Sequence, residues 1–222
     1  MKNAPIIFSA GSKGGVGKSL ICCSIIDYID DLNKKFIFVE TDTSNPDVAK
    51  AYQSSVQTKV INMDTSDGWL LFIDTCDSNP DSIIIVNTAA RSNTGVDKFG
   101  ANLNNSLGEL NRDLITLWPI NRSRDSIDLL LDFADQFTHA KITVLRNEIF
   151  GEKEKFELFN TTPQCKDMEA KEFPALADRV VDAMNKNRYT IRNSLIELSI
   201  ANRAELRRWK LAVKILFDEV IK

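Results

Sequence analysis

Histidine and cysteine are scarce in this 222-residue sequence, and their scarcity argues against the common metal centres. His139 is the only histidine, and the four cysteines (Cys22, Cys23, Cys76 and Cys165) contain no C-x-x-C pair. Zinc and iron–sulfur sites need cysteine or histidine ligands at characteristic close spacings. We therefore expect the cysteines to be small buried hydrophobic residues in a reduced compartment.

Long apolar runs are also absent. No stretch approaches the ~20 apolar residues that a membrane span needs. The first ten residues show no signal peptide, and the chain contains no internal repeat or low-complexity tract. These absences favour a cytoplasmic protein for which membrane association is not expected.

An excess of positive charge is lacking as well, because the formal net charge is -3 and the sequence pI is about 5.3. A general grip on nucleic acid through counterion release is therefore not expected, although a local basic patch remains open. Hydrophobic residues make up 43% of the chain and charged residues 27%. This composition can bury a sizeable core, and the length suits a single α/β domain.

Short apolar runs alternate with longer amphipathic stretches through the first two thirds of the chain. Five runs are predicted as buried strands, at residues 5–9, 35–40, 82–86, 114–119 and 141–145. Helical periodicity is clearest at 19–31 and 126–137. Bare apolar strands are typical of a parallel sheet covered on both faces. The alternation predicts an α/β fold with a doubly wound, mostly parallel sheet.

The last part of the chain shows helical patterns only, at 173–183 and 193–221, and the polar segment 151–171 has no clear pattern. We predict one domain over residues 1–222, with about 173–222 as a helical C-terminal cap. Five apolar residues follow a helical period in the last helix: Leu206, Trp209, Val213, Leu216 and Val220. This stripe predicts docking on the core. Contact of the neighbouring basic residues with DNA, a partner or a membrane remains open.

Residues 12–19 read S-K-G-G-V-G-K-S, between the first predicted strand and the first predicted helix. Glycines let backbone N–H groups turn toward phosphate oxygens, and the helix N-terminus attracts the same oxygens. We expect Lys18 to reach the β- and γ-phosphates and Ser19 to bind magnesium. The predicted site for ATP and Mg²⁺ consists of Ser12, Lys13, Gly14, Gly15, Val16, Gly17, Lys18, Ser19 and Leu20.

The loop departs from the ordinary Walker A pattern because Ser12 occupies the position of its first glycine. The form x-K-G-G-x-G-K-S resembles the deviant Walker A motif of the MinD/ParA family of ATPases. The resemblance implies an ATP-dependent homodimer in which Lys13 reaches the nucleotide of the partner subunit. A cation there would stabilise the charge that grows during phosphoryl transfer.

Two further segments resemble landmarks of that family. Residues 38–44 are similar to its V-D-x-D-P-Q segment, which puts Glu40 at the first acidic position. The resemblance implies that Asp42 is catalytic, ordering the attacking water or a magnesium-bound water. Asn87 stands where the family has its Walker B aspartate. Its amide can still accept a hydrogen bond from a metal-bound water, but it carries no charge. We therefore expect weakened magnesium binding or turnover, which Asn87→Asp would strengthen.

The adenine contact is expected after the strand at 141–145, where Asn147 offers an amide to the base edge. Residues 118–126, 144–151 and 202–209 look like plasmid mobilisation and stability ATPases of the MobD/StbB type. That likeness implies a nucleotide-dependent dimer switch in plasmid partition, stability or conjugative mobilisation, with a relaxase or partition protein as partner. Two alternatives stay open: an ATP-binding adaptor with little hydrolysis, and a small-molecule ligase on the same fold.

Overall fold

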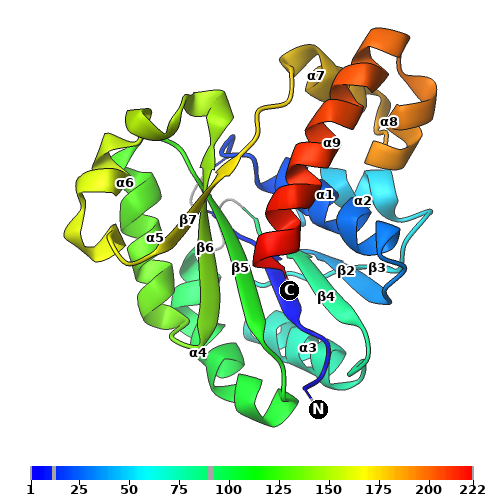
Figure 1. The fold of residues 1–222 in the computed structure, drawn as a ribbon. Helices are drawn as coiled ribbons and strands as arrows, with labels where there is room; N and C mark the ends of the chain where they lie inside the picture. Colours follow the sequence, from blue (N-terminus) through cyan, green and yellow to red (C-terminus); the bar gives the residue numbers. More distant parts are fainter. Residues whose placement is uncertain (1, 12–13, 90–92, 222) are drawn as a thin grey trace.

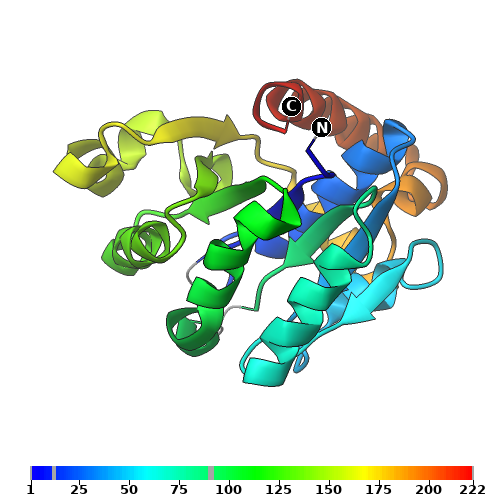
Figure 2. The ribbon, with the colours of Figure 1, turned by 90° about the horizontal axis from the view of Figure 1, so that it is seen from below.

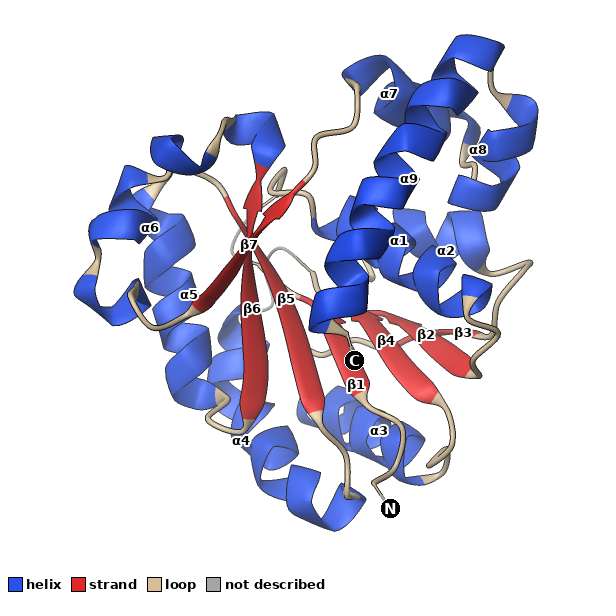
Figure 3. Ribbon diagram, viewed as in Figure 1, coloured by secondary structure: helices blue, strands red, loops and turns tan. Residues whose placement is uncertain are grey.

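A computed structural model describes residues 2–11, 14–89 and 93–221 of the chain. These residues build a seven-stranded sheet in the order β3-β2-β4-β1-β5-β6-β7, and every pair of neighbouring strands is parallel (Figures 1 and 3). The strands are β1 (Ile6–Ser9), β2 (Phe36–Glu40), β3 (Thr58–Val60), β4 (Ile83–Asn87), β5 (Leu114–Ile120), β6 (Ala140–Asn147) and β7 (Glu169–Phe173).

The helices form a layer on each face of the sheet (Figure 2). One face is covered by α1 (Lys18–Asp31), α2 (Asp47–Tyr52), α7 (Asp178–Asn187), α8 (Ile191–Glu197) and α9 (Ile200–Val220). The other face is covered by α3 (Ser66–Asp77), α4 (Asn93–Leu110), α5 (Arg124–Gln136) and α6 (Glu157–Thr161). Short 3-10 helices occur at Glu148–Phe150, Lys153–Lys155 and Pro163–Cys165.

The central strands are apolar along their whole length because both of their faces are covered. Every residue of β1, β4 and β5 is buried, as expected for strands with helices on both sides. The five predicted strands are all present, with ends within two residues of the prediction. The predicted doubly wound α/β fold is confirmed.

The sequence prediction missed both edge strands. Strand β7 reads Glu-Ala-Lys-Glu-Phe, and only Phe173 in it is buried. Charged side chains are usual on edge strands, where they oppose pairing with other chains, and they hid this strand from a search for apolar runs. The predicted helix at 173–183 was therefore wrong at its start, since Phe173 ends β7 and α7 begins at Asp178. Pro174 could have shown that Phe173 is not helical, because the residue before a proline favours extended backbone.

Helix α9 docks on the core, as its apolar stripe predicts. All five stripe residues are buried, and Trp209 is fully enclosed. The indole N–H of Trp209 donates to the Pro174 carbonyl at 2.8 Å, and its ring meets Phe173 edge-on with 5.9 Å between ring centroids. On α1, Asp27 and Asp31 lie 2.8 and 2.9 Å from the Lys210 ammonium. The last helix is thus fastened to both β7 and α1.

Candidate functional site

The carboxyl ends of the central strands surround a cleft of about 560 Å³. Asn87, the last residue of β4, pairs in register with Ser9 at the end of β1 and with Glu40 at the end of β2. Ligands of open α/β sheets bind beside strand ends of this kind. The predicted residues that line the cleft are Gly14, Gly15, Gly17, Lys18, Ser19, Leu20, Asp42, Asn87 and Asn147.

The phosphate loop has the backbone that its glycines allow. Gly15 and Gly17 have φ angles of 81° and 105°, a region that other residues seldom adopt. A Cβ atom on Gly17 would also lie 2.5 Å from the Asn147 amide nitrogen. Beside Gly14 and Gly15, an added Cβ would meet no atom within 4 Å. That open space is where a phosphate group would lie. The predicted residues Ser12 and Lys13 lie outside the described residues.

Lys18 begins α1 and is only 7% exposed. The hydroxyl of Ser9 donates to the Lys18 carbonyl at 2.8 Å, which ties β1 to the first turn of the helix. Burial lowers the pKa of the Lys18 ammonium to about 8, and the charge of Asp42 partly offsets that effect. A largely buried ammonium held at a helix N-terminus is suited to bind an anion.

Asp42 follows β2 and is half-buried at the cleft. Its Oδ1 accepts hydrogen bonds from the Ser44 hydroxyl at 2.7 Å and from the Asn45 backbone N–H at 2.9 Å. Burial opposes ionisation, but these hydrogen bonds and the charge of Lys18 lower the pKa of the Asp42 carboxyl. A carboxylate that stays ionised is available to a cation or to a water molecule in the cleft.

Glu40 and Asn87 form a buried pair beside this carboxylate. The Asn87 amide nitrogen donates to Glu40 Oε1 at 2.9 Å, and the backbone N–H of Asp42 donates to the same oxygen at 3.1 Å. Burial raises the pKa of the Glu40 carboxyl to about 7, against the lowering effect of these bonds. Glu40 Oε2 and Asn87 Oδ1 are buried without a partner in the described part of the chain. The carboxyl group that the sequence lacks at the end of β4 is therefore supplied by β2, within hydrogen-bond distance of Asn87.

The expected gain in magnesium binding or turnover on Asn87→Asp stays a prediction. The structure adds an effect on stability, because the substitution would place a second carboxylate against Glu40. We expect the variant to unfold about 2–3 kcal/mol more easily at pH 8, because two buried like charges repel. The loss should shrink below the pKa of about 7, where one carboxyl can hold a proton and bond to the other. Chemical denaturation at pH 5.5 and pH 8 measures both effects.

The matched control is the double variant Glu40→Gln/Asn87→Asp, which exchanges the carboxylate and the amide between the two strands. It keeps one charge and one hydrogen bond, so it should recover most of the lost stability. A single Asn87→Asp variant as stable as the wild type at pH 8 would show that the two side chains do not interact in solution.

Asn147 braces the phosphate loop. Its amide nitrogen donates to the Val16 carbonyl at 3.0 Å, and its Oδ1 accepts from the backbone N–H of Ile149 at 3.2 Å. One amide hydrogen is left for a ligand. Val16 itself is buried, and its carbonyl is the acceptor of this hydrogen bond.

Sequence reasoning missed one wall of the cleft, formed by the segment that joins β7 to α7 and by the first turns of α7. The lining residues from this wall are Pro174, Leu176, Asp178, Val181, Asp182 and Asn185. Prediction of a helix over 173–183 concealed the loop at 174–177. A strand at 169–173 would have placed this loop at the ligand-binding edge of the sheet.

The cleft residues fit a nucleoside triphosphate with magnesium. The loop offers open space beside two glycines, and Lys18 supplies a buried cation. The hydroxyl of Ser19 and the carboxylate of Asp42 are oxygen ligands of the kind that Mg²⁺ prefers. Elsewhere, no group of three or more histidine, cysteine or acidic residues in the described chain could hold a metal ion. No helix among those residues is long and apolar enough to cross a membrane.

Known proteins resemble this chain in sequence and in fold. No family model matches the sequence. Protein MobD of Acidithiobacillus ferrooxidans is 46% identical over 221 residues, which cover 97% of each chain. The septum site-determining protein MinD of Pyrococcus horikoshii, solved with Mg-ADP, superposes with a TM-score of 0.63 at 11% identity, over 98% of this chain and 97% of that one. A plasmid partition protein of Borrelia burgdorferi bound to AMPPNP gives a TM-score of 0.56 at 15% identity, over 96% and 99%. Both structures share the fold of this chain.

Proposed function

The chain belongs to the MobD family, and on that premise we propose that it is a magnesium-dependent ATPase that switches a plasmid partition, stability or mobilisation complex between two states. One observation carries the proposal: Lys18, Ser19, Asp42 and Asn87 line a single cleft at the end of a glycine-rich loop. The adenine nucleotides in the two solved structures of the same fold support ATP as the ligand.

Each side chain has a separate task in this proposal. Lys18 and the N-terminus of α1 would hold the phosphates, and the Ser19 hydroxyl and the Asp42 carboxylate would hold the magnesium ion. Bound magnesium would neutralise phosphate charge and so ease phosphoryl transfer. Asp42, kept ionised by its hydrogen bonds, orients water at the cleft. Asn87 contributes an uncharged acceptor whose orientation is set by its bond to Glu40.

Phosphate release from ATP, measured with and without Mg²⁺, tests the proposal. We expect magnesium-dependent release that rises when plasmid DNA and a relaxase or partition protein are added. The uncharged Asn87 favours a second candidate, an ATP-binding adaptor with little hydrolysis. Tight ATP binding with no release under any of these conditions would favour the adaptor. Absence of ATP binding would overturn both candidates.

ATP-dependent dimerisation through Lys13 is the expected consequence of the deviant Walker A resemblance. Lys18 already serves the phosphates within one subunit, so a second lysine in the loop is useful if it reaches a nucleotide on a facing subunit. Burying that cation without a phosphate would be unfavourable, so the dimer should form only with ATP present. We expect light scattering to detect a dimer of the wild type with ATP, and monomers with ADP or without nucleotide.

The variant Lys13→Ala should remain monomeric with ATP while still binding it. Lys34→Ala is the matched control, because Lys34 is an exposed lysine between α1 and β2. A wild type that is monomeric under every condition would contradict the facing-subunit role of Lys13. A dimer that ignores both nucleotide and Lys13 would indicate a constitutive interface elsewhere.

A further inference from the structure

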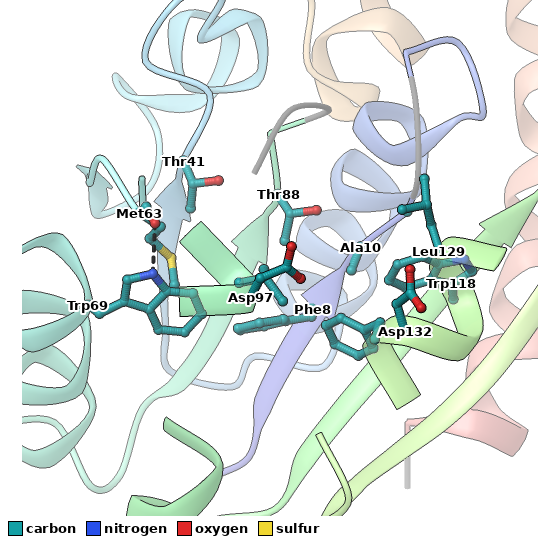
Figure 4. Close-up of a pocket in the computed structure, with 13 residues that line it drawn as sticks. Phe8, Ala10, Thr41, Met63, Trp69, Thr88, Asp97, Trp118, Leu129 and Asp132 are labelled. Carbon is teal, nitrogen blue, oxygen red and sulfur yellow. Dashed lines mark hydrogen bonds between the residues drawn. The ribbon is translucent and has the colours of Figure 1, made fainter. Parts of the chain in front are cut away.

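A second cavity, which we name the aromatic cavity, lies on the face of the sheet opposite α1. Its floor and sides come from Phe8 of β1, Trp69 of α3, Trp118 of β5 and Phe133 of α5 (Figure 4). The volume is about 50 Å³. One water molecule needs roughly 10–15 Å³ on this measure, so the cavity has room for a flat group of several heavy atoms.

Two carboxylates lie at this cavity, and no cation of the described residues pairs with either of them. Asp97 extends from α4 and Asp132 from α5, and Figure 4 shows Asp97 beside Phe8 and Asp132 beside Trp118. Both residues are exposed, and neither has an ion pair or hydrogen bond within the described ranges. Among the described residues that line the cavity, none is cationic. The cavity therefore combines an apolar, aromatic interior with a negatively charged rim.

The two tryptophans that line the cavity differ in the hydrogen bonding of their indole N–H groups. Trp118 is 3% exposed, and its indole N–H is buried without an acceptor in the described structure. By contrast, Trp69 satisfies its own indole N–H through the Met63 carbonyl at 2.7 Å. A buried donor without a partner is unfavourable.

We propose that the aromatic cavity is a binding site for an alkylguanidinium group, either of a free small molecule or of an arginine side chain in a polypeptide. A guanidinium is flat, stacks on tryptophan and phenylalanine rings, and pairs with carboxylates. Its four heavy atoms suit the small volume. An arginine residue also brings peptide groups that can contact the cavity rim, whereas a free alkylguanidine has none.

The cavity is connected to the nucleotide cleft by shared backbone. Thr88 lines both spaces, and Gly11 and Thr41 of the cavity immediately precede the phosphate loop and Asp42. The Thr41 hydroxyl donates to the Asn87 carbonyl at 3.0 Å and accepts from the Ala89 N–H at 2.9 Å. Binding of a guanidinium is therefore expected to alter nucleotide affinity. This linkage rests on the proposed function, whereas the binding itself does not.

Tryptophan fluorescence tests the binding, because two of the three tryptophans line the cavity. The probes are agmatine, N-acetyl-arginine-N-methylamide and the uncharged N-acetyl-norleucine-N-methylamide. We expect a saturable change with the first two probes and none with the third. In Asp97→Asn/Asp132→Asn, binding should weaken about tenfold, as loss of two rim ion pairs predicts. Asp135→Asn, the same type of substitution three residues after Asp132 on α5 and outside the described lining, should bind as the wild type does.

The outcomes distinguish a free small molecule from a polypeptide arginine, and they distinguish failure of the cavity site from failure of the proposed ATPase function. If N-acetyl-arginine-N-methylamide binds at least tenfold more tightly than agmatine, the natural ligand is an arginine side chain of a polypeptide. Equal affinities of the two probes would indicate a free alkylguanidine as the natural ligand. No saturable signal with either cation, or equal binding by the double Asn variant, would overturn the proposal. Guanidinium binding in a protein that does not bind ATP would leave the cavity site standing and reject the proposed function instead.

Discussion

The variant Lys18→Ala is expected to lose ATP binding while keeping its fold. Lys18 places a buried ammonium at the loop that faces the phosphates. A charge-assisted hydrogen bond of this type contributes roughly 1.5–3 kcal/mol, so the affinity should fall about 10- to 150-fold. Titration with a fluorescent ATP analogue measures the loss. Lys34→Ala, which removes an exposed lysine, is the matched control.

The pH dependence of the same titration gives an independent check. The free protein holds the pKa of Lys18 at about 8, and bound phosphate would raise it. Affinity should therefore be constant well below pH 8 and decrease as the pH rises above it, because binding then needs an additional proton. Lys18→Ala should lack this decrease. Unchanged ATP affinity in Lys18→Ala would remove the basis for the phosphate-loop assignment.

The variant Arg112→Met is expected to have the largest effect on stability. Arg112 lies between α4 and β5, at the end of the sheet away from the cleft, and is 4% exposed. Its guanidinium donates to backbone carbonyls of the segments that lead into β1 and β4 and of the end of α3. The acceptors are Ala4 at 2.5 Å, Ser82 at 2.9 Å, Cys76 at 2.8 Å and Asn79.

Methionine would fill much of the same space but would leave buried carbonyl groups without a donor. We expect a loss of about 3–5 kcal/mol in the free energy of unfolding. For a chain of this size, that corresponds to a decrease in Tm of roughly 6–20 °C. Arg124→Met is the control, because the Arg124 side chain is 80% exposed and its ion pair with Asp128 lies on the same helix. Equal Tm values for the two variants would contradict the clamp role of Arg112.

The parts of the fold that were predictable are those whose signals are local. Apolar β-branched runs marked β1 and β4 because these strands are buried on both faces. The glycine-rich loop could be located because the positions of its glycines and of Lys18 in the sequence directly determine the backbone of the loop. Strand β7 was not predictable from apolar pattern, since a charged edge strand resembles a loop in sequence.

The Glu40–Asn87 pair was also beyond local pattern. Each residue ends its own strand, and the two meet only because β2 and β4 are neighbours in register. Taken alone, Asn87 suggests a missing charge. Considered together with Glu40, Asn87 indicates that the carboxyl group of the site is supplied by β2. The sequence places both residues at strand ends, but the order of strands in the sheet decides which side chains touch.

The anchoring of α9 has a consequence for how the protein is made. The wall at 174–185 that completes the nucleotide cleft is held by Trp209 through the Pro174 carbonyl, and α1 is held by Lys210. During synthesis on the ribosome, the sheet and the phosphate loop emerge well before these two residues do. A nascent chain that has not yet released α9 therefore has a phosphate loop but an unsupported wall. Nucleotide binding should therefore require a fully synthesised chain. A chain that ends before residue 209 should not compete with full-length copies for ATP.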